Sequence, residues 1–126
     1  MKLDYLGSGS LDCPLVRLYD FTPGEAMKLH RAISRLAENV VDQIAVHEMR
    51  TVQAVEGCRL VFRVREWDHG IVRCGTPCDF ECGFTRGTWD NVAGLVEPFA
   101  EGGGGFQWLA GAPGEASLLL SVDGKW

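Results

Sequence analysis

Apolar and polar residues alternate through the middle of the chain, and the alternation is cleanest between Cys58 and Trp67. Every second residue in this stretch is apolar: Cys58, Leu60, Phe62 and Val64. The residues between them face the other way: Arg59, Val61, Arg63, Arg65 and Trp67. Strict alternation is typical of a half-buried strand. The stretch therefore predicts the central strand of an antiparallel meander, with one side turned toward a core.

Weaker versions of the same pattern predict further strands on both sides of this one. Their ranges are Lys2–Leu6, Pro14–Phe21, Val40–Val55, Ile71–Cys74, Asp79–Thr85, Phe106–Ala110 and Ala116–Val122. The alternation fails near Glu48, which predicts a bulge or bend there. Thr76 and Pro77 interrupt the ladder, so Asp79–Thr85 is expected at an edge or a corner. The run Leu118–Leu120 predicts a strand that is buried on both faces.

Two segments have the apolar spacing of helices instead. The first begins with Thr22, Pro23 and Glu25, which form a capping-box signal, and it is expected to end near Asn39. The second is expected to begin after a Thr88 cap. Proline lacks the N–H group that a helix interior requires, so Pro98 predicts an end near Glu97.

These elements predict a single α+β domain that covers residues 1–126, in the order ββαββββαββ. The sheet is expected to be mainly antiparallel, with both helices packed on one face. No internal repeat is apparent in the sequence. Hydrophobic residues make up 46% and charged residues 23% of the chain, as in ordinary globular proteins. The chain contains no apolar run of about 18 residues and no signal-peptide pattern at its start, so we expect a cytoplasmic protein without membrane association.

Charge and cysteine content narrow the function classes. The formal net charge is −5, which argues against a general nucleic-acid binder, because such proteins use lysine and arginine to displace counterions from phosphates. The five cysteines are an odd number, so they cannot all be paired in disulfides, and we interpret them as reduced thiols. No cofactor is predicted.

The outward row of Arg59, Arg63, Arg65 and Trp67 is the main candidate site. Arginine binds carboxylates and phosphates through paired hydrogen bonds, and tryptophan is enriched in the residues that dominate binding energy. The alternative is a solvated sheet face, with the arginines paired to Glu48, Glu66 or Glu81 and their aliphatic stems covering Trp67.

A second candidate is a cluster of Cys74, Cys78, Cys82 and His69, whose residue types could bind zinc. Buried free cysteines are the stronger interpretation, because Cys82 alternates with core phenylalanines. Cys74 or Cys78 could also act as a nucleophile, but no motif places a histidine beside either thiol. If the strands pair in register, His47 and Glu66 could come close enough for acid/base chemistry.

The sequence thus favours a non-enzymatic binding or accessory module, such as an inhibitor, an immunity-type protein, an adaptor or a chaperone-like protein. It would bind a protein partner through the row of arginines and tryptophan, or associate with itself through that face. The alternative is a small enzyme or ligand-binding domain. Its site would lie between sheet and helices and would use histidine with a carboxylate, or cysteine with histidine, with or without zinc.

Overall fold

A computed structural model describes residues 1–75 and 78–126 of the chain, so the predicted strand break at Thr76 and Pro77 lies outside the described residues. The strands are β1 Lys2–Leu6, β2 Leu15–Tyr19, β3 Gln43–Ala45, β4 Gln53–Ala54, β5 Arg59–Val64, β6 Gly70–Arg73, β7 Asp79–Phe84, β8 Phe106–Ala110 and β9 Ser117–Ser121. The α-helices are α1 Pro23–Ala37 and α2 Arg86–Ala100. Two short 3₁₀ helices, Val46–Glu48 and Val55–Gly57, flank β4.

The strands form two mixed sheets rather than one mainly antiparallel sheet. The five-stranded sheet has the order β4-β1-β2-β9-β8, and the four-stranded sheet has the order β3-β5-β7-β6. Hairpin neighbours are antiparallel, whereas β2 pairs with β9, β5 with β7 and β1 with β4 in parallel. The α+β class and the hairpin of β1 and β2 are confirmed. The prediction of a mainly antiparallel sheet is wrong, because the central parallel pairs join segments that are far apart in the sequence.

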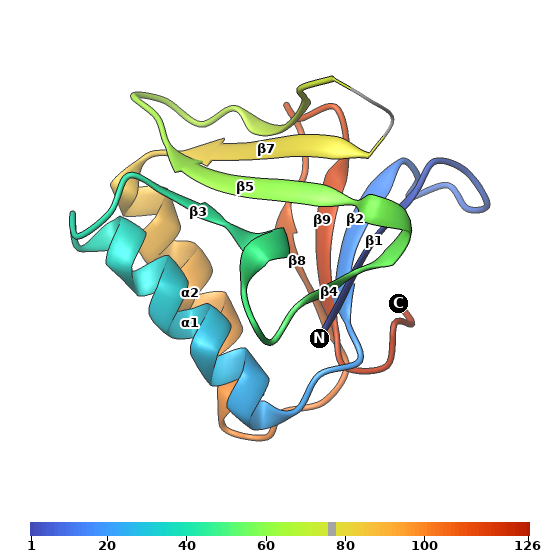
Figure 1. Ribbon diagram of the computed structural model, residues 1–126, viewed down its shortest axis with the longest axis horizontal. Coiled ribbons are helices and arrows are strands. Elements are labelled where there is room, and N and C mark those ends of the chain that lie inside the picture. The colour runs from blue at the N-terminus through green and yellow to red at the C-terminus, as the bar shows by residue number, and fades with distance from the viewer. Residues whose placement is uncertain (76–77) are drawn as a thin grey trace.

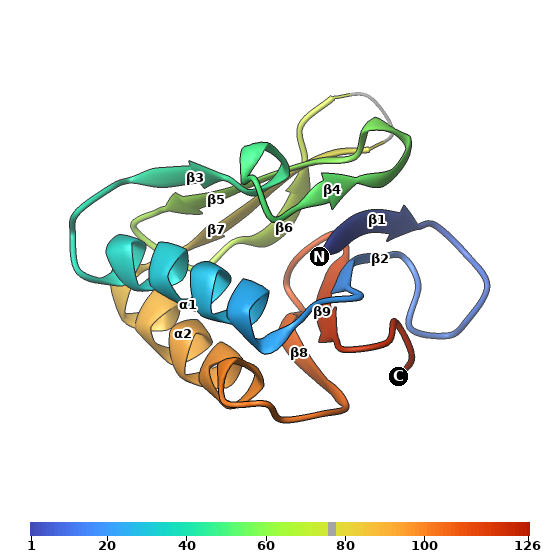
Figure 2. The same ribbon diagram turned by 60° about the horizontal axis from the view of Figure 1, so that its bottom comes forward.

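The connectivity repeats itself, contrary to the expectation of no internal repeat. Residues 2–64 run β1-β2-α1-β3-β5, with β4 inserted before β5, and residues 70–121 run β6-β7-α2-β8-β9. The last strand of each half pairs in parallel with the strand that precedes the helix of the other half. Thus β5 pairs with β7, and β9 pairs with β2. The two sheets are therefore related by an approximate two-fold arrangement, with α1 and α2 side by side between them (Figures 1 and 2).

The two helices match residue by residue. Each has 15 residues and follows a Phe-Thr-x-Gly sequence, at 21–24 and at 84–87. The cap is Thr22 in one and Thr85 in the other, and both threonine side chains accept a hydrogen bond from the backbone three residues later. The buried positions of α1 correspond one to one with positions in α2: Ala26, Leu29, Ile33 and Leu36 with Trp89, Val92, Val96 and Phe99.

The second helix differs from its prediction at both ends. It begins after Thr85 rather than Thr88, and it continues through Pro98 to Ala100. Pro98 lacks the N–H group that would bond to the Gly94 carbonyl oxygen, but it lies in the last turn, which is closed by the Glu101 N–H group donating to the carbonyl oxygens of Glu97, Pro98 and Phe99. The first helix has its predicted capping box, with Glu25 and Thr22 bonded to each other's backbone. Its α-helical part ends at Ala37.

Two of the predicted strands also need correction. The range Val40–Val55 is not one strand but β3 and β4, separated by the 3₁₀ helix where the alternation fails at Glu48. The predicted edge strand Asp79–Thr85 is β7, which lies between β5 and β6 and is not an edge. Its inward residues Phe80, Cys82 and Phe84 are buried, as their alternation indicates.

The main core lies between the helices and the inner faces of the sheets. Trp89 of α2 is fully buried, and its ring packs at 4.8 Å from Phe62 of β5 and at 5.0 Å from Phe84 of β7. Its indole N–H donates a hydrogen bond to the Arg63 carbonyl oxygen at 3.0 Å, so the one polar atom of this side chain is satisfied. Neither helix in the described part of the chain is long and apolar enough to cross a membrane.

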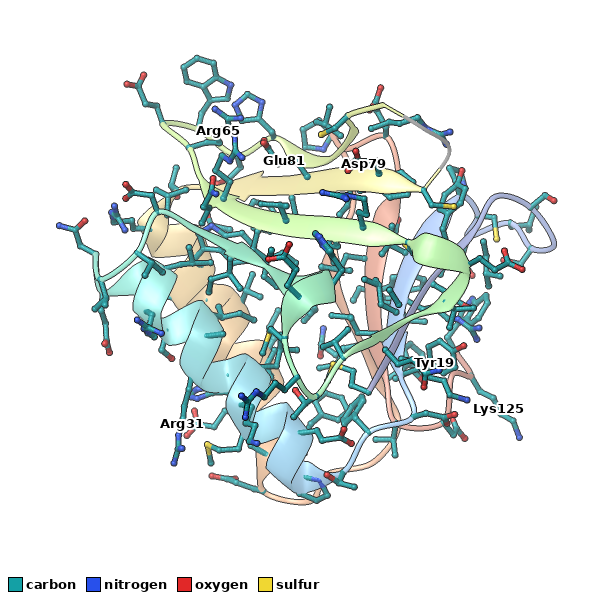
Figure 3. All side chains as sticks on the ribbon, in the orientation of Figure 1. Tyr19, Arg31, Arg65, Asp79, Glu81 and Lys125 are labelled. Atoms are coloured by element: carbon teal, nitrogen blue, oxygen red, sulfur yellow. The ribbon has the colours of Figure 1, made fainter. Side chains whose placement is uncertain are left out.

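The outer face of the five-stranded sheet is covered by the C-terminal segment 122–126. Arg17 of β2 donates to the Gly124 carbonyl oxygen at 2.8 Å, and Ser121 donates to that of Lys125 at 2.6 Å. The Trp126 indole donates to Asp12 in the loop between β1 and β2. Figure 2 shows the segment turning back beside β2 and β9, and Figure 3 shows Lys125 on the same side as Tyr19. Trp126 thus folds back onto the body of the protein.

Candidate functional site

The predicted row of Arg59, Arg63, Arg65 and Trp67 belongs to the outer face of the four-stranded sheet, the face turned away from the helices. Arg59 and Arg63 lie on β5 itself, whereas Arg65 and Trp67 follow its last residue, Val64. The strand is therefore shorter than the predicted range Cys58–Trp67. Its inward residues Leu60 and Phe62 have no exposed surface, so the inward half of the prediction is confirmed.

Two carboxylates of β7 lie beside the arginines. The parallel register places Arg59 opposite Asp79 and Glu81 opposite Val61, two pairs before Arg63 and its partner Gly83. Arg65 holds Glu81 through both carboxylate oxygens at 2.8 to 3.1 Å, while Arg63 approaches the same carboxylate to 3.3 Å. Arg59 and Asp79 are only loosely paired, at 4.0 Å. Figure 3 shows Arg65 beside Glu81, with Asp79 farther along β7.

Gly83 makes this arrangement possible. A Cβ atom at this position would lie 2.8 Å from Cγ of Arg65 and 3.5 Å from the Glu81 carboxylate. With no side chain there, the stem of Arg65 lies flat across β7 and directs its planar guanidinium group at Glu81. A bidentate pair of this kind is strongly oriented, so Arg65 is held in place before any partner arrives.

Arg63 is less completely satisfied than its neighbour. Its Nε atom is buried and has no hydrogen-bond partner among the described residues, although the outer part of the side chain is 36% exposed. Its backbone is fixed, because its carbonyl oxygen accepts from Trp89. Arg63 therefore has a guanidinium group with an unused hydrogen-bond donor, on a backbone that is held by the buried Trp89.

Trp67 lies on the loop between β5 and β6 and is 63% exposed. Its ring stacks on His69, with the ring centroids 5.2 Å apart and the planes at 28°. The two rings line an open concavity of about 460 Å³ together with Val64, Arg65 and Glu66. Trp67 is therefore largely uncovered, which differs from the solvated alternative, whereas the pairing of Arg63 and Arg65 with Glu81 agrees with it.

Asp68 ties the loop that carries Trp67 to the first turn of α2. One carboxylate oxygen accepts from the Thr85 backbone N–H at 3.0 Å and the other from the Thr88 hydroxyl at 2.8 Å. The hydrogen bond from the Thr85 backbone, followed by weaker contributions from the threonine side chains and His69, lowers the pKa of Asp68 below its ordinary value. The loop is consequently held at its centre by the cap of a helix.

The candidate zinc cluster does not form one site in the described residues. The β6 and β7 register places Val72 opposite Glu81, so Cys74 lies on the outer side, whereas Cys82 is fully buried on the inner side. Burial raises the pKa of the Cys82 thiol strongly, and burial with nearby Glu81 and Asp79 raises that of Cys74. Burial also raises the pKa of Cys58 to about 12. No cluster of three or more possible metal ligands occurs in residues 1–75 and 78–126.

His47 is not brought near Glu66. Its Nδ1 atom lies 3.1 Å from both the backbone nitrogen and the backbone oxygen of Leu60 on β5. The imidazole therefore occupies the place of a backbone hydrogen-bond partner of β5, just after β3 ends and the 3₁₀ helix begins. Its side chain is 10% exposed, and the nearest carboxylate is that of Glu48, at 3.9 Å from Nε2. The contacts of His47 are those of a residue that completes the β5 edge.

Of the three acids that the sequence offers as arginine partners, Glu81 fills that role, while Glu48 lies beside His47 instead. Glu66 lines the concavity. Gly83 is a site residue that the sequence analysis did not identify. The sequence Asp68-His69-Gly70 indicates a turn, but it does not indicate that Asp68 accepts a hydrogen bond from the backbone of Thr85, the helix cap 17 residues later.

Comparison of the chain with protein-family models, curated proteins and solved structures finds no match.

Proposed function

We propose that this chain is a non-enzymatic binding or accessory module that holds a protein partner on the outer face of its four-stranded sheet. Inhibitors, immunity-type proteins, adaptors and chaperone-like proteins belong to this class. The observation that carries the proposal is Trp67, which is exposed at the rim of a concavity although the loop on both sides of it is anchored. Tryptophan and arginine dominate the energy of many protein interfaces.

The chemistry of the face supports this proposal. Glu81 of β7 lies at the centre of the face, between Val61 of β5 and Val72 of β6, and both valines are half-buried. Protein interfaces combine apolar contacts with hydrogen-bonded polar groups, and this face offers both. Three arginines stand against the two carboxylates of Asp79 and Glu81, so the face favours an acidic or mixed-charge partner surface.

Preorganisation supports it as well. Arg65 is already fixed by Glu81, and the Trp67 loop is already fixed by Asp68, so little side-chain freedom is lost when a partner binds. The corresponding outer face of the other sheet is covered by the C-terminal segment. The four-stranded sheet has no such cover among the described residues.

A photo-crosslinking experiment in the cells that produce the protein tests the proposal. A benzophenone side chain is introduced at Val72 on the face, and at Asn91 on the exposed side of α2 as the matched control. We expect a specific adduct from position 72 and none from position 91. The protein in the adduct is then purified, and its affinity for the full-length chain is measured.

We expect Trp67→Ala and Arg59→Glu each to weaken that affinity by about tenfold or more, as for central interface residues. Both side chains are exposed, so circular dichroism should show an unchanged fold. Equal adducts from both positions, or an affinity that neither substitution alters, would overturn the proposal.

A further inference from the structure

A second surface, separate from the outer sheet face, lies on the helix side of the molecule. Lys28, Arg31 and Arg35 follow one another along the exposed side of α1, and all three are exposed. They line an open groove of about 330 Å³ whose other lining residues are Ala32, Ile44 and Met49. Figure 3 shows Arg31 projecting from α1 away from the sheets. The groove combines a row of cations with an apolar floor.

No ion pair within residues 1–75 and 78–126 neutralises the cations of this groove. The chain has 12 lysines and arginines. Those with an ion-pair partner among the described residues are Lys2, Arg17, Arg59, Arg63, Arg65 and Arg86. Lys28, Arg31 and Arg35 have none in that part of the chain. A protein with a net charge of −5 therefore concentrates three of its free cations in one place.

This concentration opposes helix stability. Residues three or four positions apart are neighbours on a helix, so Lys28 repels Arg31, and Arg31 repels Arg35. The repeat within the fold shows that the pattern is not imposed by the architecture. The corresponding positions on α2 are Asn91, Gly94 and Pro98, none of which is charged. An anionic partner would relieve the repulsion that α1 alone retains.

We propose that this groove docks an acidic amphipathic helix of a partner protein. A rise of 1.5 Å per residue spaces the three cations by roughly 4.5 and 6 Å along α1. A second helix with carboxylates at positions i, i+3 and i+7 has the same spacing, so each acid meets one cation. An extended strand repeats its same-side residues at about 6.6 Å, which does not match both intervals.

The floor of the groove suits the apolar side of such a helix. Ala32 lets the partner backbone approach α1, while Ile44 of β3 and Met49 provide apolar contact. Methionine is flexible and adapts to different side chains, as in other grooves that accept amphipathic helices. The three cations select an acidic partner and fix where its helix lies along α1. The apolar residues of the floor contribute the buried apolar area.

Two synthetic peptides of identical composition test this inference on the full-length protein. Each has about 18 residues, long enough to populate a helix when bound. In the first, glutamate occupies positions i, i+3 and i+7 with leucine on the adjoining stripe. In the second, glutamate and leucine alternate, which favours an extended chain. Binding is measured by calorimetry and by backbone amide chemical shifts at low and at high salt.

We expect the helical peptide to bind at least about tenfold more tightly than the alternating one, with shifts at Arg31, Ala32, Ile44 and Met49. Salt should weaken the binding, because exposed charges are screened. Arg31→Glu should abolish binding, and Arg31→Gln should weaken it less. Lys125→Glu is the matched control, since it reverses another exposed cation without an ion pair, and it should leave affinity unchanged.

Equal binding of both peptides, or an equal loss of affinity in Lys125→Glu, would overturn the inference. So would tighter binding of a DNA duplex, which would identify a general polyanion surface instead. A control with Trp67→Ala separates this groove from the proposed sheet site. If the helical peptide binds Trp67→Ala as it binds the unaltered chain, the groove acts independently, and loss of binding there would contradict that.

Discussion

The outer faces of the two sheets have the same place in the repeated architecture but differ in what lies on them. On the five-stranded sheet, Leu15, Leu119 and Ser121 have no exposed surface, and the C-terminal segment crosses the face. On the four-stranded sheet the corresponding surface carries Val61, Val72 and a row of arginines, all partly open. The comparison shows that coverage, rather than strand order, distinguishes a structural face from one that is available to a partner.

The same difference appears in the arginine pairs of the two faces. Arg17 grips Asp4 at 2.6 and 3.0 Å beneath the C-terminal segment, and the two side chains are 17% and 13% exposed. Arg65 grips Glu81 with similar geometry, but its side chain is 40% exposed. Two chemically equal pairs thus lie in different surroundings, and their contributions to stability should differ.

The largest effect is expected for Arg17→Met. It leaves Asp4 as an unpaired, mostly buried charge and removes the donor to Gly124, so the free energy of unfolding should fall by about 3 kcal/mol. Arg65→Met should cost less, about 1 kcal/mol, because the Arg65 side chain is 40% exposed and Arg63 remains near Glu81, although the Glu81 side chain is itself only 14% exposed. Urea unfolding followed by circular dichroism measures both. Equal losses would remove the distinction between the faces.

Next comes Gly124→Ala. Gly124 has a φ of +83°, and a Cβ there would lie 3.0 Å from the Arg17 guanidinium and 3.1 Å from the Tyr19 ring. We expect a loss of about 1 to 2 kcal/mol and greater quenching of Trp126 fluorescence by acrylamide. Gly83→Ala on the open face should cost less, because Gly83 has no positive φ, although Arg65 must shift relative to Glu81 to make room for the Cβ atom. A larger loss in Gly83→Ala would contradict this reasoning.

Asp68→Asn should have a smaller effect, about 1 kcal/mol, comparable to the loss of a helix cap. The pKa of Asp68 is lowered in the folded protein, so its contribution is present above the pKa of the unfolded chain and is lost as the pH falls through the folded value. The difference between variant and unaltered protein should therefore be full at neutral pH and shrink toward strongly acidic pH. A difference that does not change with pH would exclude the ionised carboxylate as its cause.

The smallest effect is expected for Trp67→Ala, which should change stability by less than about 0.5 kcal/mol because the side chain is 63% exposed and stacks on His69 near the surface. Trp126→Ala should cost more, since that indole donates to Asp12 and helps hold the C-terminal segment. Thermal unfolding measured by calorimetry compares the two. If Trp67 proves the more stabilising tryptophan, its exposure serves the fold rather than a partner.

Local structure was largely predictable from the sequence. The capping box at Thr22, the hairpin of β1 and β2, the inward side of β5 and the doubly buried run at Leu118 all follow from spacing within a few residues. The end of α2 was not, because Pro98 removes a single hydrogen bond and the last turn is closed by the Glu101 N–H group. Local rules locate elements well and are least reliable at their ends.

The partners of the strands were not predictable in the same way. Alternation along β7 placed Asp79 and Glu81 on the side opposite Phe80, but it could not show that β7 lies beside β5. Once that neighbour is known, the pairing of the arginines follows directly. The basic groove on α1 was missed for a similar reason, since Ile44 and Met49 reach it from a different element.

The exchange of last strands between the halves has a consequence for how the chain folds. The pair β2 and β9 brings Leu15 beside Ser117, so the five-stranded sheet closes only when the two ends of the chain meet. Pairings of such long sequence separation slow folding, since the entropy of loop closure is lost before the contact is gained. Until β9 arrives, the apolar edge of β2 stays unpaired. Refolding should therefore be slow and sensitive to protein concentration, with the helices forming ahead of that sheet.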